Sequence, residues 1–156
     1  MRIREGDPLE IYTDREGEVI LKKYSMIGDI GQFAKQYADA LSQTTGYLVI
    51  VTDRDMVIAA SSGVKKDMVG KHISRELEKA ALDRKIILTD SSKKEFCRVA
   101  DDMEGDYIEA IAPIICNGDV AGSIVFLNKN TERKFGETEQ KMIAVAASFL
   151  GKQMEG

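Results

Sequence analysis

The stretch Tyr107–Asn128 is apolar at most positions and carries the dipeptide Asn117-Gly118 near its middle. Asn-Gly between two apolar runs is the strongest short-range signal for a β-hairpin, because both turn residues need positive φ. A two-residue loop pairs Cys116 with Asp119. This register predicts Ile111/Ile124 on one face, and Ile114/Ala121, Ala110/Val125 and Ile108/Leu127 on the other. A strand pair that is apolar on both faces needs a cover on both faces, which indicates the middle of a layered domain.

Pro113 interrupts the first of these two strands and lies close to Gly122 in the predicted pairing. Proline has no N–H group to donate to a sheet ladder. We therefore expect a β-bulge or a sheet edge at this point.

Two further strand pairs are predicted around turn-rich segments. Tyr47–Thr52 and Met56–Ala60 are near-continuous apolar runs that flank Asp53-Arg54-Asp55. Ile86–Leu88 and Glu95–Val99 are shorter and are joined by a polar segment. Continuous apolar strands again indicate a sheet that is buried on both faces.

Helical spacing of apolar residues predicts three helices: Ser25–Thr45, which ends at Gly46; Arg75–Arg84, with Ser74 as N-cap; and Gly136–Met154. The first stripe consists of Met26, Ile30, Phe33, Tyr37 and Leu41, and the last of Met142, Val145, Ala146 and Phe149, with Leu150 and Met154 near it. The predicted fold class is α+β with α/β/α layers. The long first and last helices lie on one face of an antiparallel sheet, and the short helix and loops lie on the other.

Residues 1–24 form a separate unit, in which Leu9–Tyr12 and Glu18–Leu21 flank a charged turn. A lone two-stranded hairpin is marginally stable in water. It must pack on this domain, on another subunit or on residues outside this sequence. It is therefore either a packing flap or half of an interrupted domain.

Composition narrows the class of protein. The chain has 156 residues, of which 44% are hydrophobic and 31% are charged, as in a globular protein. The net charge of −4 argues against these residues gripping nucleic acid, because neutralising phosphates needs a basic surface. No apolar run is long enough for a membrane span, and the N-terminus lacks the apolar core of a signal peptide. We interpret the protein as cytoplasmic.

No catalytic constellation, metal site or cofactor motif is predicted, and we interpret the chain as not being an enzyme. Cys97 and Cys116 lack ligand spacing, and His72 is the only histidine. The acidic loop Ala100–Asp106 lacks the spacing of a calcium loop, and Ser61–Gly70 lacks that of a phosphate loop. Four residues are candidates for lining a ligand pocket: Ser61, Ser62, Lys65 and Arg84. Lys65 with Lys66 could meet an anionic ligand or be a solvated pair.

The order of helix, two strands, short helix, strands, long hairpin and helix resembles a GAF domain. The run Asp14–Ser25 also resembles the junction in the stage V sporulation protein T family of transcription regulators, in which an AbrB-type swapped-hairpin DNA-binding domain leads into a GAF domain. Further similar segments are Phe33–Lys35, Tyr37–Leu41, Asp53–Asp55, Lys65–Asp67, Pro113-Ile114, Asn117–Asp119 and Gln153–Glu155. The resemblance covers essentially the whole chain.

This resemblance implies two domains, a partial swapped-hairpin segment at 1–24 and a GAF-like domain at 25–156. In the family, two hairpins per chain intertwine between subunits, and the arginine-rich first half makes most of the DNA contact. We expect that upstream half to lie outside this sequence, so that DNA binding would depend on it.

Cyclic-nucleotide GAF domains share an N-K…F-x-x-x-D-E pattern. Asn128-Lys129 and Phe135–Gln140 follow it only partly, with Glu139 at the Asp position and Gln140 at the Glu position. A Lys129–Glu139 ion pair could pin the loop to the last helix, which is a structural role.

The first hypothesis is therefore a regulatory and oligomerising part of a sporulation-type transcription factor. A small molecule would bind between the second sheet face and Ser61–Arg84, and the first and last helices would pair in a homodimer or tetramer. The alternative is a ligand-free scaffold that only oligomerises DNA-binding heads. A third hypothesis is a methionine sulfoxide reductase using Cys97 and Cys116, disfavoured because neither has a base or an arginine nearby in sequence.

Overall fold

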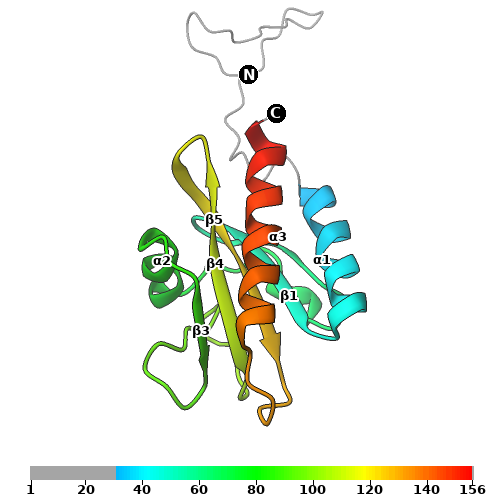
Figure 1. The fold of residues 1–156 in the computed structure, drawn as a ribbon, viewed down its shortest axis with the longest axis vertical. Helices are drawn as coiled ribbons and strands as arrows, with labels where there is room; N and C mark the ends of the chain where they lie inside the picture. Colours follow the sequence, from blue (N-terminus) through cyan, green and yellow to red (C-terminus); the bar gives the residue numbers. More distant parts are fainter. Residues whose placement is uncertain (1–30, 156) are drawn as a thin grey trace, which may run out of the picture.

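A computed structural model describes residues 31–155 and places them in three layers (Figure 1). The middle layer is one antiparallel sheet in the order β2-β1-β5-β4-β3. Its strands are β1 (Leu48–Asp53), β2 (Val57–Ala60), β3 (Ile87–Asp90), β4 (Ile108–Cys116) and β5 (Asp119–Asn128). The long helices α1 (Gly31–Thr45) and α3 (Glu137–Glu155) cover one face. The short helix α2 (Arg75–Leu82) and the 3-10 turn η2 (Lys66–Met68) cover the other. The predicted fold class is confirmed.

Both faces of the sheet are apolar and buried, as the sequence predicts. Toward α1 and α3 the sheet presents Val49, Val51, Ala110, Ala112, Ile114, Ile124 and Phe126. Toward α2 it presents Ile50, Val57, Ile111, Val125 and Leu127. Burying apolar surface stabilises a fold by roughly 25 cal/mol per Å² removed from water. The two cores therefore hold the three layers together.

The Asn117-Gly118 turn joins β4 to β5 as predicted, with φ of 53° and 86°. Cys116 pairs with Asp119, also as predicted, but the register then shifts between Ile114 and Ile115. Beyond the shift the actual pairs are Ile114/Gly122, Ala112/Ile124, Ile111/Val125, Ala110/Phe126 and Ile108/Asn128.

Ala121 is thus an extra residue in β5, and the expected bulge lies beside Gly122. The predicted pairs beyond the bulge are wrong because each is displaced by one residue. The reason lies on the neighbouring strand. A Cβ on Gly122 would lie 1.9 Å from the carbonyl oxygen of Thr52, so β5 presses bare backbone against β1 at this point. One inserted residue moves each later side chain to the opposite face.

The helix ends follow local signals. Gly46 ends α1 with φ of 82°, and the hydroxyl of Ser74 caps α2 by accepting a hydrogen bond from the N–H of Leu77. α2 stops at Leu82, short of the predicted Arg84, which has φ of 61°. The part of the predicted Ser25–Thr45 helix that precedes Gly31, and the predicted hairpin at residues 1–24, lie outside the described residues.

The buried face of α3 differs from the predicted stripe. Ala146, Leu150 and Met154 are buried as predicted, but Val145 is 65% exposed and Phe149 is 39% exposed. Ile143, Ala147 and Gly151 are buried in their place. A Cβ on Gly151 would lie 2.2 Å from the carbonyl oxygen of Ile115. The helix therefore turns its small residues toward β4 to approach closely, which rotates Val145 and Phe149 outward.

The predicted strand at Glu95–Val99 is wrong, because this segment pairs with no strand. The N–H of Cys97 donates to the side chain of Glu109, and the carbonyl of Val99 accepts from the N–H of Ser74. A side chain and a helix cap thus satisfy backbone groups that a sheet ladder would otherwise use.

Candidate functional site

A cavity of about 270 Å³ lies on the α2 face of the sheet, and we call it the loop-side cavity. Its apolar walls are Leu48, Ile50, Val64, Met68, Met103, Tyr107 and Leu127. They come from β1, β5, the segment after β2 and the connection between β3 and β4. Gly63 brings the first of these segments close to the sheet, since a Cβ there would lie 2.7 Å from Cδ2 of Leu48.

Charged groups surround this apolar space. They are Lys65, Asp67, Lys71, Asp102, Glu104 and Lys129. Lys71 bridges two segments because its ammonium donates to the carboxylate of Asp102. This hydrogen bond raises the pKa of Lys71 and lowers the pKa of Asp102. Within residues 31–155, Lys65, Lys129 and Glu104 form no ion pair, so two cations and one carboxylate are available to a ligand.

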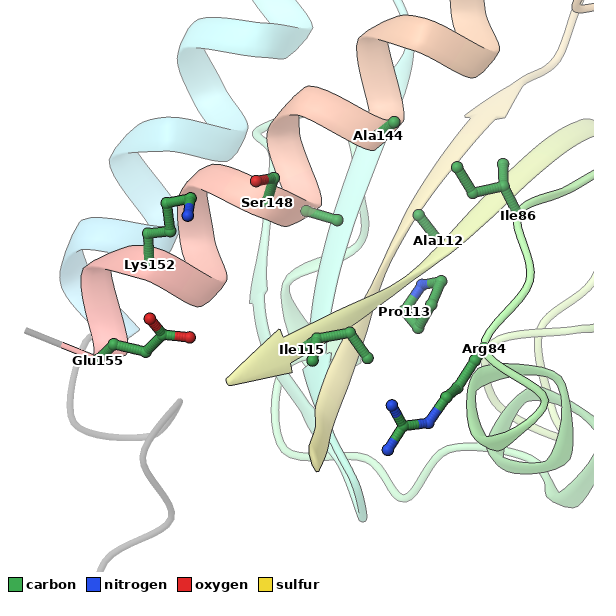
Figure 2. Close-up of a pocket in the computed structure, with 10 residues that line it drawn as sticks. Arg84, Ile86, Ala112, Pro113, Ile115, Ala144, Ser148, Lys152 and Glu155 are labelled. Carbon is green, nitrogen blue, oxygen red and sulfur yellow. The ribbon is translucent and has the colours of Figure 1, made fainter. Parts of the chain in front are cut away.

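A second hollow, the α3-edge groove, has a volume of about 330 Å³ (Figure 2). It lies between α3 and the part of β4 beyond Ile111, which has no partner in β3. Ala112, Pro113 and Ile115 of β4 face Ala144, Ser148 and Lys152 of α3 across it. Its other polar groups hold the β4–β5 turn. Arg84 donates to the carbonyl of Gly118 at 2.7 Å, and Glu155 accepts from the N–H of Asn117 at 2.9 Å.

The four residues predicted to line a pocket occupy different places. Lys65 lines the loop-side cavity and Arg84 lines the α3-edge groove. Ser61 is buried and its hydroxyl accepts the N–H of Val49, whereas Ser62 donates its N–H and its hydroxyl to Asp39 of α1.

Sequence reasoning did not single out Lys71, Asp102 or Lys129 as cavity residues. The available signal was their position. Lys129 directly follows β5, and the acidic loop that contains Asp102 returns the chain to β4. Both chain segments must therefore lie at the end of the sheet where the cavity opens.

Glu139 has partners other than Lys129. Its carboxylate accepts the hydroxyl of Tyr47 at 2.7 Å and the N–H of Gly136 at 2.8 Å. Burial, together with this hydrogen bond, raises the pKa of Tyr47 to about 12. No Lys129–Glu139 ion pair occurs among the described residues. The start of α3 is instead pinned to the start of β1.

Neither thiol is activated as a nucleophile, because burial raises the pKa of both. Cys97 and Cys116 are free and buried. Burial, with Glu109 and Glu76 nearby, raises the pKa of Cys97 to about 12, so it is a thiol and not a nucleophilic thiolate at neutral pH. No cluster of metal-ligating side chains occurs in residues 31–155. No helix in this range is both long and apolar enough to cross a membrane.

Residues 29–155 match the family model described as stage V sporulation protein T C-terminal, transcription factor. The chain belongs to this family. Stage V sporulation protein T of Bacillus subtilis (strain 168) is 46% identical over 156 residues, which cover 99% of this chain and 85% of that protein. The stage V sporulation protein T family is one of transcription factors and not a class of enzymes.

Solved structures establish the fold of this family member as that of a GAF domain. The GAF domain of an Acinetobacter phosphoenolpyruvate-protein phosphotransferase superposes with a TM-score of 0.65 at 12% identity, covering 80% of this chain and 81% of that chain. The cyanobacteriochrome receptor PixJ superposes with a TM-score of 0.67 at 16% identity, covering 84% and 98%.

Proposed function

We propose that the GAF-like domain is the regulatory part of a sporulation transcription factor, and that a small molecule in the loop-side cavity modulates DNA binding. The observation that carries this proposal is the cavity itself, in which Lys65 and Lys129 flank apolar walls that include Ile50 and Leu127. A concave apolar site with a few polar groups is the usual form of a ligand pocket. The lysines favour a small organic anion with an apolar body.

A route from this cavity to α1 runs through Ser62. The segment that carries Lys65 begins at Ser61, and Ser62 donates to Oδ1 of Asp39 in α1 at 2.9 Å from its N–H and at 3.1 Å from its hydroxyl. Lys35 holds the other oxygen of Asp39 at 2.9 Å. A ligand that prefers one arrangement of this segment would shift α1, whereas equal affinity for both arrangements would change nothing.

We further propose that α1 and α3 pair with those of another subunit in a homodimer or tetramer. Val145 and Phe149 are exposed on α3, and Phe149 lies 5.2 Å from Tyr37 of α1 between ring centroids. This aromatic contact continues to Phe33, at 5.9 Å from Phe149. The two helices thus present one apolar seam that a second copy would cover.

We further propose that residues 1–24 contribute to the DNA-binding domain. Residues 25–156 would then form the regulatory domain, and the protein would act in the cytoplasm. The resemblance of Asp14–Ser25 to the family junction supports this division.

Native mass spectrometry of the purified protein tests the proposal, because it weighs the oligomer and any bound small molecule together. We expect a dimer or tetramer that carries one adduct per subunit. The double variant K65Q/K129Q should lose the adduct, and K66Q/K152Q, which makes the same charge change away from the cavity, should retain it. A ligand found this way must also alter DNA affinity in the full protein.

The alternative is a ligand-free scaffold, which the exposed seam of α1 and α3 would support on its own. Joining several weakly binding DNA heads raises affinity through effective concentration, without any ligand. An oligomer that carries no adduct, and whose DNA affinity is the same in K65Q/K129Q, would favour this scaffold over the sensor. A bare monomer would contradict both.

A further inference from the structure

Glu109 is the most deeply buried acid of the described chain. It lies in β4, directly opposite Thr89 of β3 and Leu127 of β5, and it is 0% exposed. Like Leu127, it faces the α2 side of the sheet, where the connection between β3 and β4 covers it.

The hydrogen bonds of this carboxyl are incomplete. Oε1 accepts the N–H of Cys97 at 2.9 Å, and within the described residues Oε2 has no partner. The hydroxyl of Thr89, on the strand opposite, is also buried without a partner. An ionised carboxylate can accept about four hydrogen bonds, and burying it with one is far more costly than burying the neutral acid.

No cation compensates for this burial. Glu109 forms no ion pair within residues 31–155. Arg98 is the nearby positive charge, but its guanidinium donates to the carbonyls of Met103 and Gly105. The facing groups on the other elements are the carboxylate of Glu76 on α2 and the thiol of Cys97, and Leu127 of β5 is apolar.

Glu109 also fastens the covering connection. The base of that connection is closed by Ser91, whose N–H donates to the carbonyl of Tyr107 at 3.0 Å. Its middle is held by the Cys97–Glu109 hydrogen bond and by the N–H of Ser74, which donates to the carbonyl of Val99 at 2.8 Å. Lifting this connection from the sheet would expose Glu109 to water.

We propose that Glu109 carries a proton in the folded domain, and that this proton makes the seal between residues 91–107 and the sheet depend on pH. The same connection brings Met103 and Glu104 to the loop-side cavity. The seal would therefore also govern access to that cavity. Only this link to the cavity rests on the proposed function.

The direction of the pH effect follows from the two states. Burial raises the pKa of Glu109 from 4.5 to about 8, with Glu76 acting in the same direction and the Cys97 N–H and Arg98 opposing it. Between these values the folded chain binds a proton that the unfolded chain releases. The stability contributed by this group is therefore complete below pH 4.5 and is lost as pH rises toward about 8.

Urea denaturation of the full chain at a series of pH values from about 5 to 8 tests the proposal. The unfolding equilibrium constant of the wild type should rise by up to about tenfold per pH unit relative to that of E109Q, which cannot ionise. The variant E137Q removes an exposed carboxylate at the start of α3, on the opposite face of the sheet, and should keep the wild-type slope. Parallel curves for wild type and E109Q would overturn the proposal.

A direct titration decides the matter if E109Q does not fold. Carbon-13 NMR of the glutamate carboxyl groups in the wild type should show one that titrates several pH units above the others. If every glutamate titrates in the ordinary range, the proposal is wrong. Neither measurement needs a ligand, so this failure would leave the sensor proposal standing, and the absence of a ligand would leave this one standing.

Discussion

The two faces of the sheet are covered in different ways. On one face, α1 and α3 approach the strands through small residues, among them Ala34, Ala38 and Gly151. On the other face, the short α2 and two irregular connections leave the loop-side cavity open and enclose Glu109. Close packing resists change, whereas irregular covers open at lower cost. We therefore expect a ligand to act first on the loop face, and α1 and α3 to move only as rigid helices.

The largest effect should come from filling the closest contact on the helical face. G151V would place a Cβ 2.2 Å from the carbonyl oxygen of Ile115, and backbone cannot move aside as a side chain can. We expect a loss of about 4 kcal/mol in unfolding free energy, or failure to fold. Urea denaturation measures it. G136A, at a glycine with open space around it, is the control and should behave like the wild type.

A matched pair of truncations separates stability from response. L150A on the helical face and L127A on the loop face each remove a buried leucine and should each cost about 3 kcal/mol. Only L127A also enlarges the loop-side cavity, so only it should alter the adduct seen in native mass spectra. If L150A changed the adduct as strongly, the assignment of response to the loop face would fail.

A smaller effect is expected at the cap of α2. The hydroxyl of Ser74 accepts the N–H of Leu77 at 3.1 Å and donates to the carbonyl of Arg98, so it ties α2 to the connection over Glu109. S74A should lower the unfolding free energy by about 1 kcal/mol, and amide hydrogen exchange at the start of α2 and near Arg98 should quicken. S74T keeps the hydroxyl and should keep the protection; equal loss in both variants would contradict the capping role.

The smallest effect should occur at Arg84, which combines backbone strain at positive φ with a hydrogen bond to the carbonyl of Gly118. A non-glycine residue at φ of 61° is disfavoured by about 1 kcal/mol, and glycine would relieve this strain. R84G would also lose the hydrogen bond to Gly118, worth a similar amount. The net change in thermal midpoint should be close to zero. R84V, which loses the bond and adds a β-branched side chain at positive φ, should be clearly destabilised.

Features set by adjacent residues were predictable from the sequence. Asn117-Gly118, Gly46 and Ser74 act within a few residues of their own positions, and each ends or caps its element as expected. The near-continuous apolar runs Tyr47–Thr52 and Met56–Ala60 likewise predicted the β1–β2 pair and its burial on both faces.

Features set by distant residues were not predictable. The bulge depends on Gly122 meeting the backbone of Thr52, and the rotation of α3 depends on Gly151 meeting Ile115. The segment Glu95–Val99 is not a strand because the N–H of Cys97 donates to the side chain of Glu109 and not to a neighbouring strand. The candidate site shows the same limit, because only Lys65 of the four proposed residues lies at the loop-side cavity, which is assembled from four separate segments.

The unequal lengths of β3 and β4 have a consequence for assembly. β3 begins at Ile87, opposite Ile111, so β4 continues beyond Ile111 without a partner strand on this side, along the α3-edge groove. Such an edge is a template for an invading strand of another molecule, and through it for open-ended aggregation. Pro113 withholds a donor there, and the Arg84 side chain reaches across to the turn at Gly118. These two residues oppose fibrous growth when the protein is abundant.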